Sequence, residues 1–165
     1  MELMYVLDDT VGSSRRINAT VLAYIAGFLD GDGCIKSKVE HRECARFGSY
    51  IKVVVTFSQH LRDRHVLEWI HNQLRIGSIS DYDKPSKHLS EYQITDGKFI
   101  ERLLKNLDRY VVNKKEQLRL ALIILSLKDR AKNENSFKTA IWAANRMHEL
   151  NSSCSPVTTD MGGTR

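Results

Sequence analysis

The sequence predicts an α+β domain in which helices and antiparallel hairpins follow the order αββαββα, with two additional C-terminal helices. Two observations support this prediction. Two pairs of segments alternate apolar and polar side chains with a period of two, which is typical of half-buried strands. Around them, apolar residues recur at spacings of three and four, which is typical of amphipathic helices.

The first half of the chain provides a helix and two hairpins. Asn18 is the expected cap of a helix that ends near Asp32. The alternating segments that follow are IKSKVEHR (35–42) with YIKVVVTFS (50–58), then GSISDYD (77–83) with LSEYQITD (89–96). Between the two pairs, RDRHVLEWIHNQL (62–74) predicts a helix that buries Val66, Trp69, Ile70 and Leu74.

Three helices are predicted after the second hairpin. The first covers 98–110, the second runs from a cap at Asn113 to about 129, and the third begins at Ser136. We therefore expect an N-terminal arm at 1–17, one folded domain at 18–150 and a disordered tail at 151–165, where turn-forming residues dominate.

Composition narrows the class of protein. The chain has 165 residues and a formal net charge of +5, which favours an anionic partner. Its three cysteines have no paired spacing, which indicates reduced thiols and an intracellular protein, in the cytoplasm or an organelle. No signal peptide is recognised, and the longest apolar run, LALIILSL (120–127), is too short for a membrane span.

The stretch AYIAGFLDGDGCI (23–35) shows two unusual features. Small residues recur at every fourth position of the helix and form one stripe, which allows another backbone to approach closely. These residues are Ala19, Ala23, Gly27 and Gly31. Two carboxylates, Asp30 and Asp32, stand at the negative end of the helix dipole, where an anion is unfavourable.

A symmetric partner would account for both features. If an identical helix packs on the stripe, two-fold symmetry brings two copies of Asp32 together, and their repulsion points to a bound cation. Carboxylate oxygens favour a hard ion such as Mg²⁺. A calcium EF-hand is excluded because it needs an acid or amide at Cys34 and a glycine at Ile35. A plain Asp-Gly turn remains an alternative.

The segment IAGFLDGDG (25–33) resembles the motif of the LAGLIDADG homing endonucleases. Five of the nine positions are identical, and four are conservative replacements. The order of elements over 18–150 fits that family too. The resemblance implies a homing endonuclease, encoded by an intron, that makes a metal-dependent double-strand break in a long near-palindromic DNA site. It also implies a homodimer, because the chain carries one copy of the motif, and Mg²⁺ or Mn²⁺ as the cofactor.

The same resemblance implies roles for particular residues. Asp32 would be a catalytic residue and a metal ligand, with the backbone carbonyl of Gly31 beside it. Gln59 follows the second strand, where relatives carry a polar residue that orients water. Lys114, favoured over its neighbour Lys115, matches a lysine at the start of a later helix. Where some relatives carry a further basic residue this chain has Asp63, so Arg62 and Arg64 stay unassigned.

The outward faces of the four strands are expected to bind DNA. They mix hydrogen-bond donors, acceptors and charges, which suits base edges in the major groove. The residues are Lys36, Lys38, Glu40, Arg42, Tyr50, Lys52, Thr56, Ser78, Ser80, Tyr82, Glu91 and Gln93. Lys84, Lys87 and His88 in the second hairpin turn suit phosphates.

Two other functions fit the same fold. One is an RNA-binding maturase that assists intron splicing, and the other is a DNA-binding regulator without cleavage activity. The presence of Asp32, Gln59 and Lys114 favours the nuclease, whereas a basic surface attracts either RNA or DNA.

Overall fold

A computed structural model describes residues 4–8, 14–41, 43, 47–85, 87–128 and 134–152. Within them the α+β class and the predicted order of elements are confirmed, and a short strand pair precedes the first helix. The elements are β1 (Met4–Asp8), β2 (Ser14–Asn18), α1 (Ala19–Asp32), β3 (Gly33–His41), β4 (Ser49–His60), the 3-10 turn η1 (Leu61–Asp63), α2 (Arg64–Leu74), β5 (Ser78–Lys84), β6 (Lys87–Ile94), α3 (Gly97–Leu107), α4 (Lys115–Lys128) and α5 (Glu134–Ser152).

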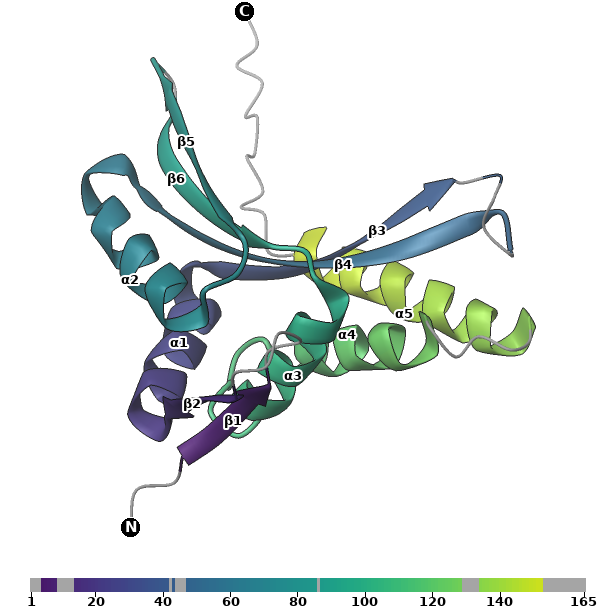
Figure 1. Cartoon of the computed structure of the whole chain (residues 1–165). Helices are drawn as coiled ribbons and strands as arrows, with labels where there is room; N and C mark the ends of the chain where they lie inside the picture. Colours follow the sequence, from purple (N-terminus) through teal and green to yellow (C-terminus); the bar gives the residue numbers. More distant parts are fainter. Residues whose placement is uncertain are drawn as a thin grey trace, which may run out of the picture.

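Four strands form one antiparallel sheet in the order β3-β4-β6-β5. The helices lie against one face of it, and the hairpins β3–β4 and β5–β6 splay apart as two wings (Figure 1). Helix α5 runs beneath the β3–β4 wing, whereas α2 lies beside the β5–β6 wing (Figure 1). The opposite face of the sheet is therefore the one on which a ligand of the sheet would lie.

The core fills the space between the sheet and the helices. Ile35, Val53, Val55 and Phe57 alternate along β3 and β4 and are almost completely buried, as their period-two pattern predicts. The helices α3 and α4 contribute a larger apolar set, namely Phe99, Ile100, Leu103, Leu104, Leu107, Leu118, Ala121, Ile124 and Leu125. None of the described helices has the length and apolar character that a bilayer crossing requires.

Three features differ from the sequence prediction. Ile70 and Leu74 of α2 are buried as predicted, but Trp69 is 40% exposed and Val66 is half-buried, because α2 turns Leu67 into the core in their place. Helix α4 begins at Lys115, so the side chain of Asn113 is not its cap. The expected N-terminal arm contains two strands, β1 and β2, that pair from Met4↔Asn18 to Asp8↔Ser14. Most of the expected tail, 153–165, lies outside the described residues.

Candidate active site and nucleic-acid interface

Both ends of α1 are defined by specific residues. At its start, the side chain of Asn18 accepts the N–H of Thr20 at 2.7 Å. At Gly33 the chain enters β3, and a Cβ there would lie 2.7 Å from the Cα atom of Leu29. Only glycine fits this sharp exit, which places Asp30 and Asp32 where the helix meets the sheet.

Asp30 serves the start of another helix. Its carboxylate accepts the backbone N–H groups of Val112 at 2.6 Å, Asn113 at 3.1 Å and Lys114 at 3.0 Å. Partial burial raises the pKa of Asp30. These three hydrogen bonds and the charge of Lys114 lower it by more than burial raises it, so the pKa lies below its usual value. The carboxylate thus lies at the positive end of α4, which offsets its unfavourable place at the negative end of α1.

The two adjacent lysines at this point have different partners. The ammonium group of Lys114 donates to the backbone carbonyl of Asp30 at 2.6 Å, at the negative end of α1. Lys115 instead forms an ion pair with Asp108, with Nζ and Oδ1 2.9 Å apart. Of the two, Lys114 is therefore the lysine held beside the acidic end of the motif helix.

Asp32 is exposed, in contrast to Asp30. Among the described residues it has one hydrogen-bond partner, Gln59, whose amide nitrogen donates to Oδ2 at 3.1 Å. The amide oxygen of Gln59 accepts the backbone N–H of His60 at 3.1 Å, which fixes the direction of the amide. The predicted catalytic residues Asp32 and Gln59 are therefore in direct contact.

The stripe of small residues forms an open face next to Asp32. Ala23, Gly27 and Gly31 are exposed, whereas Ala19 is half-buried. A Cβ built at Gly27 or Gly31 would meet no atom within 4 Å. The helix face that allows close approach is accordingly uncovered in a single protomer.

Two exposed aromatic side chains extend this open face. Tyr24 is 47% exposed and contacts Trp69 edge to face, with ring centroids 5.1 Å apart. They line a shallow hollow of about 470 Å³ between α1 and α2, whose other walls include Val21 and Val66. Exposed aromatic groups around a shallow apolar hollow are typical of a surface that another protein covers.

A single protomer offers only part of a metal site. No group of three or more His, Cys, Asp or Glu side chains gathers anywhere in the described part of the chain. The exposed carboxylate of Asp32 and the neighbouring carbonyl of Gly31 are oxygen donors, which fit a hard divalent cation. The donor set thus fits such an ion only with ligands from outside this protomer.

The strand register gathers the predicted DNA-binding residues on one face of the sheet. Opposite residues in antiparallel strands point to the same side. The pairs Lys38↔Lys52, Glu40↔Tyr50, Lys36↔Val54, Cys34↔Thr56, Thr56↔Gln93, Ser78↔Gln93 and Ser80↔Glu91 therefore share the face opposite the helices, with Tyr82 next along β5. All of these predicted residues except Thr56 are exposed or half-buried.

Thr56 is a correction to the predicted DNA-binding set. It points to the expected face but is only 2% exposed, because β4 is a central strand and Thr56 lies between Cys34 and Gln93. Its hydroxyl donates to the carbonyl of Cys34 at 3.5 Å. Arg42, also in the predicted set, lies outside the described residues.

Comparisons with known proteins agree with this architecture. The family description "LAGLIDADG endonuclease" matches residues 25–125. The DNA endonuclease I-CreI of Chlamydomonas reinhardtii is 24% identical over 119 residues, 72% of this chain and 71% of that protein. The DNA endonuclease I-CvuI of Chlorella vulgaris is 26% identical over 125 residues, 76% of each chain.

Solved structures give the same result. A crystal structure of I-CvuI with its DNA target and calcium superposes with a TM-score of 0.69 and 26% identity, over 80% of this chain and 82% of that one. Another structure of I-CvuI, in complex with the I-CreI target in the presence of magnesium and with the DNA not cleaved, superposes with a TM-score of 0.67 and 26% identity, over 78% of this chain and 80% of that one. This chain belongs to the LAGLIDADG endonuclease family.

Family membership confirms the prediction of a DNA endonuclease and identifies α1 as its LAGLIDADG helix. In this LAGLIDADG chain the two acids of the motif are separated: the first is bonded to the start of α4, and the second is exposed beside Gln59. The sequence alone identified the pair but not the partners of Asp30, because backbone N–H groups have no signature in the sequence.

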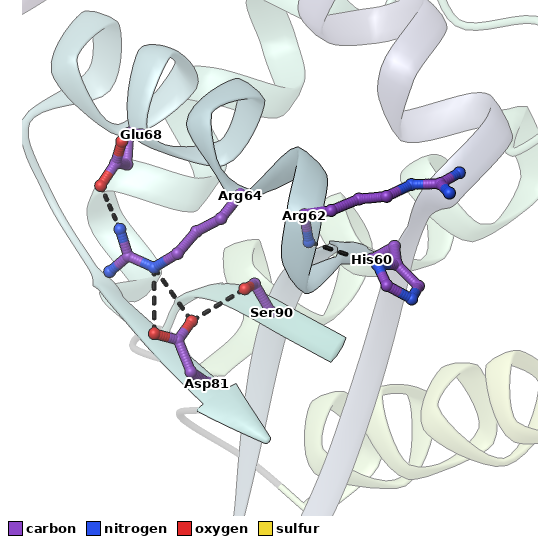
Figure 2. A network of polar contacts seen from close by, with 6 residues as sticks. All are labelled: His60, Arg62, Arg64, Glu68, Asp81 and Ser90. Carbon is purple, nitrogen blue, oxygen red and sulfur yellow. Dashed lines mark hydrogen bonds and ion pairs between the residues drawn. The ribbon is translucent and has the colours of Figure 1, made fainter. Parts of the chain in front are cut away.

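The two unassigned arginines also separate in the structure. Figure 2 shows the side chains of Arg62 and Arg64 pointing in opposite directions from η1 and the start of α2. Arg62 is 78% exposed and pairs with Asp63 at 3.1 Å. Arg64 binds Asp81 of β5, an acid to which the sequence analysis gave no role.

Proposed function

We propose that this chain is a site-specific, divalent-metal-dependent DNA endonuclease that acts as a homodimer on a long, near-palindromic duplex site. The observation that carries the proposal is the contact between Asp32 and Gln59 at the end of the motif helix, beside an open stripe of small residues. These features support a metal-binding role for Asp32 at the surface where two copies of the chain would meet.

The dimer follows from what one protomer lacks. Its stripe at Ala23, Gly27 and Gly31 is exposed, and the aromatic pair Tyr24 and Trp69 continues the same apolar surface. Packing two copies of α1 about a two-fold axis would bury this surface and bring both Asp32 carboxylates to the axis. A two-fold symmetric protein reads a site with the same symmetry, which accounts for a near-palindrome.

Asp32 and the carbonyl of Gly31 would hold Mg²⁺, or Mn²⁺ in its place, with the remaining ligands coming from the partner copy, water and a phosphate. Such an ion lowers the pKa of a bound water and stabilises the negative charge on the attacked phosphate. Gln59 orients the Asp32 carboxylate, and Lys114 keeps a positive charge at the end of α1.

The sheet would read the target sequence. Its open face carries donors and acceptors on both wings, including Lys38 and Lys52 on β3–β4 and Ser80 and Gln93 on β5–β6. An antiparallel two-stranded ribbon fits the major groove, where every base pair shows a distinct pattern of groups. Two protomers would place four such ribbons along one duplex.

The proposal is tested with a randomised duplex library. The purified protein is incubated with the library and Mg²⁺, and the cut ends are sequenced, with parallel reactions in EDTA and with a single-stranded RNA library. We expect metal-dependent double-strand cuts that converge on one near-palindromic sequence. Selective RNA binding without DNA cleavage would contradict the proposal and favour the maturase function, and binding without cutting would favour the regulator.

A further inference from the structure

Strand β5 is an edge strand of the sheet and is bonded to β6 on one side. Strand β6 pairs with β4 from Val55↔Ile94 to His60↔Leu89, and the hairpin extends beyond β4 by the two pairs Asp83↔His88 and Lys84↔Lys87. The hairpin rises away from the rest of the sheet (Figure 1). Because β5 has a strand neighbour on one side only, its direction also depends on contacts with the neighbouring helix.

One polar network joins this wing to α2 (Figure 2). The Nε atom of Arg64 lies 3.0 Å from each carboxylate oxygen of Asp81. Ser90, which is fully buried on the paired strand, donates its hydroxyl to the Oδ1 atom of Asp81 at 2.8 Å. Glu68, one turn further along α2, binds the other side of the Arg64 guanidinium.

The position of Asp81 links this network to the DNA-binding face. Asp81 is on the helix side of β5, and its neighbours Ser80 and Tyr82 point to the opposite side. Arg64 is the first residue of α2, and α2 is anchored in the core by buried leucine and isoleucine side chains. A contact that fixes Asp81 therefore also fixes the position and direction in which Ser80 and Tyr82 project from the DNA-binding face.

We propose that Arg64, Asp81 and Ser90 are positioning residues that set the reading angle of the β5–β6 wing and thereby its DNA sequence specificity. This inference rests on the proposed function. An exposed ion pair contributes little to global stability. The Nε–H of Arg64, shared by both oxygens of Asp81, together with the Ser90 hydroxyl, nevertheless limits how β5 can move relative to α2. We therefore expect the network to affect which bases are accepted more than whether the protein folds.

The other wing offers an internal control, because its support comes from a different element. The hydroxyl of Ser37 in β3 donates to the carbonyl of Ala144 in α5 at 3.3 Å, and the Asn151 side chain donates to the carbonyl of Ile35 at 3.0 Å. Loss of the Arg64–Asp81–Ser90 network should leave this wing in place.

The experiment measures base preference by binding, so it does not depend on cleavage. A target is first selected from a randomised duplex library by the wild-type protein in Ca²⁺, and every single-base variant of it is then titrated. Ser80→Ala and Tyr82→Ala identify the positions read by β5–β6, and Lys38→Ala and Lys52→Ala those read by β3–β4. The profiles of Asp81→Ala, Asp81→Asn, Arg64→Lys and the control Glu68→Gln are compared with these two sets.

We expect Asp81→Ala to reduce discrimination about five- to tenfold at the β5–β6 positions, within the range that one base contact provides, and to leave the β3–β4 positions unchanged. Arg64→Lys should give a smaller loss at the same positions, since the ammonium keeps the charge without the planar donor edge, and Glu68→Gln should resemble wild type. If Asp81→Ala does not fold, the soluble Asp81→Asn and Arg64→Lys variants decide the matter.

Unchanged profiles for these variants, or equal losses over both sets of positions, would overturn the inference. Failure of the wild-type protein to select any sequence would instead overturn the proposed function, so the two failures are distinguishable.

Discussion

Asp30 and Asp32 stand two residues apart in one motif, yet their surroundings have little in common. Asp30 is half-buried and accepts three backbone N–H groups from residues 112–114. Asp32 is exposed, and Gln59 holds one of its oxygens. The first carboxylate accepts three backbone donors at the start of α4, so it has less capacity left for a cation. The second remains accessible.

This difference suggests that one short motif contains a structural residue, Asp30, beside the proposed metal ligand, Asp32. Asp30 joins the end of α1 to the start of α4, and this junction also places Lys114 at the acidic end of the helix. Asp32 is then presented on a fixed base beside the open stripe. The predictions below test whether the two roles are separate.

The largest effect is expected from a substitution that prevents a second copy of the chain from packing against α1. Gly27→Leu places a bulky side chain on the open face, so two copies of α1 cannot approach, and we expect a monomer without detectable cleavage. The fold should survive, because leucine is about 1 kcal/mol more favourable than glycine within a helix. Sedimentation and a cleavage assay check this, with Asn145→Leu on an exposed face of α5 as the control. If Gly27→Leu still forms a dimer that cleaves DNA, the stripe is not part of the dimer interface.

Loss of Gln59 should affect the chemistry of Asp32 without affecting Asp30. We expect Gln59→Ala to slow single-turnover cleavage about 10- to 100-fold, which is typical when a group that orients a metal ligand is removed. Gln93→Ala, on the DNA-binding face of the same sheet, is the matched control and should change the accepted bases. A normal cleavage rate for Gln59→Ala would show that its contact with Asp32 has no catalytic importance.

The opposite pattern is expected for the first carboxylate. Asp30→Ala leaves three backbone donors at the start of α4 without their acceptor, and we expect a loss of about 1–2 kcal/mol in the free energy of unfolding, as for a removed helix cap. Urea unfolding at one fixed protein concentration measures it. Asp32→Ala should be neutral or slightly stabilising, because it removes an anion from the negative end of α1. Equal losses of unfolding free energy in Asp30→Ala and Asp32→Ala would contradict the assignment of a structural role to Asp30 alone.

A smaller effect is expected from pH. The pKa of Asp30 is lower in the folded chain than its usual value of 3.8, so its contribution to stability is complete above that value. The contribution is lost as the pH falls through the lowered pKa. The difference in unfolding free energy between wild type and Asp30→Asn should therefore be constant near neutral pH and shrink from about pH 5 downward. A difference that grows on acidification would contradict this assignment.

The sequence predicted the elements of the fold well and singled out both acids of the motif, for identifiable reasons. Period-two alternation located β3 to β6, although β5 has no buried residue and the middle of β4 is buried on both faces. The motif drew attention to Asp32. The partners of Asp30 were not predictable, since its donors belong to the backbone more than eighty residues later. Arg62 and Arg64 looked equivalent, and only η1 between β4 and α2 turns them to opposite sides. Thr56 fits the strand pattern, but its burial depends on both neighbouring strands.

The most direct test of separate roles compares Asp30→Asn with Asp32→Asn in three assays: cleavage in Mg²⁺, binding of the selected duplex in Ca²⁺, and urea unfolding. We expect Asp32→Asn to bind the duplex and fold normally but not to cleave it, because the amide lacks the charge that holds the cation. Asp30→Asn should keep measurable cleavage and lose stability, because its amide can accept only part of the hydrogen bonds that the carboxylate accepts. Near-normal cutting by Asp32→Asn, or the same losses in both variants, would contradict the account.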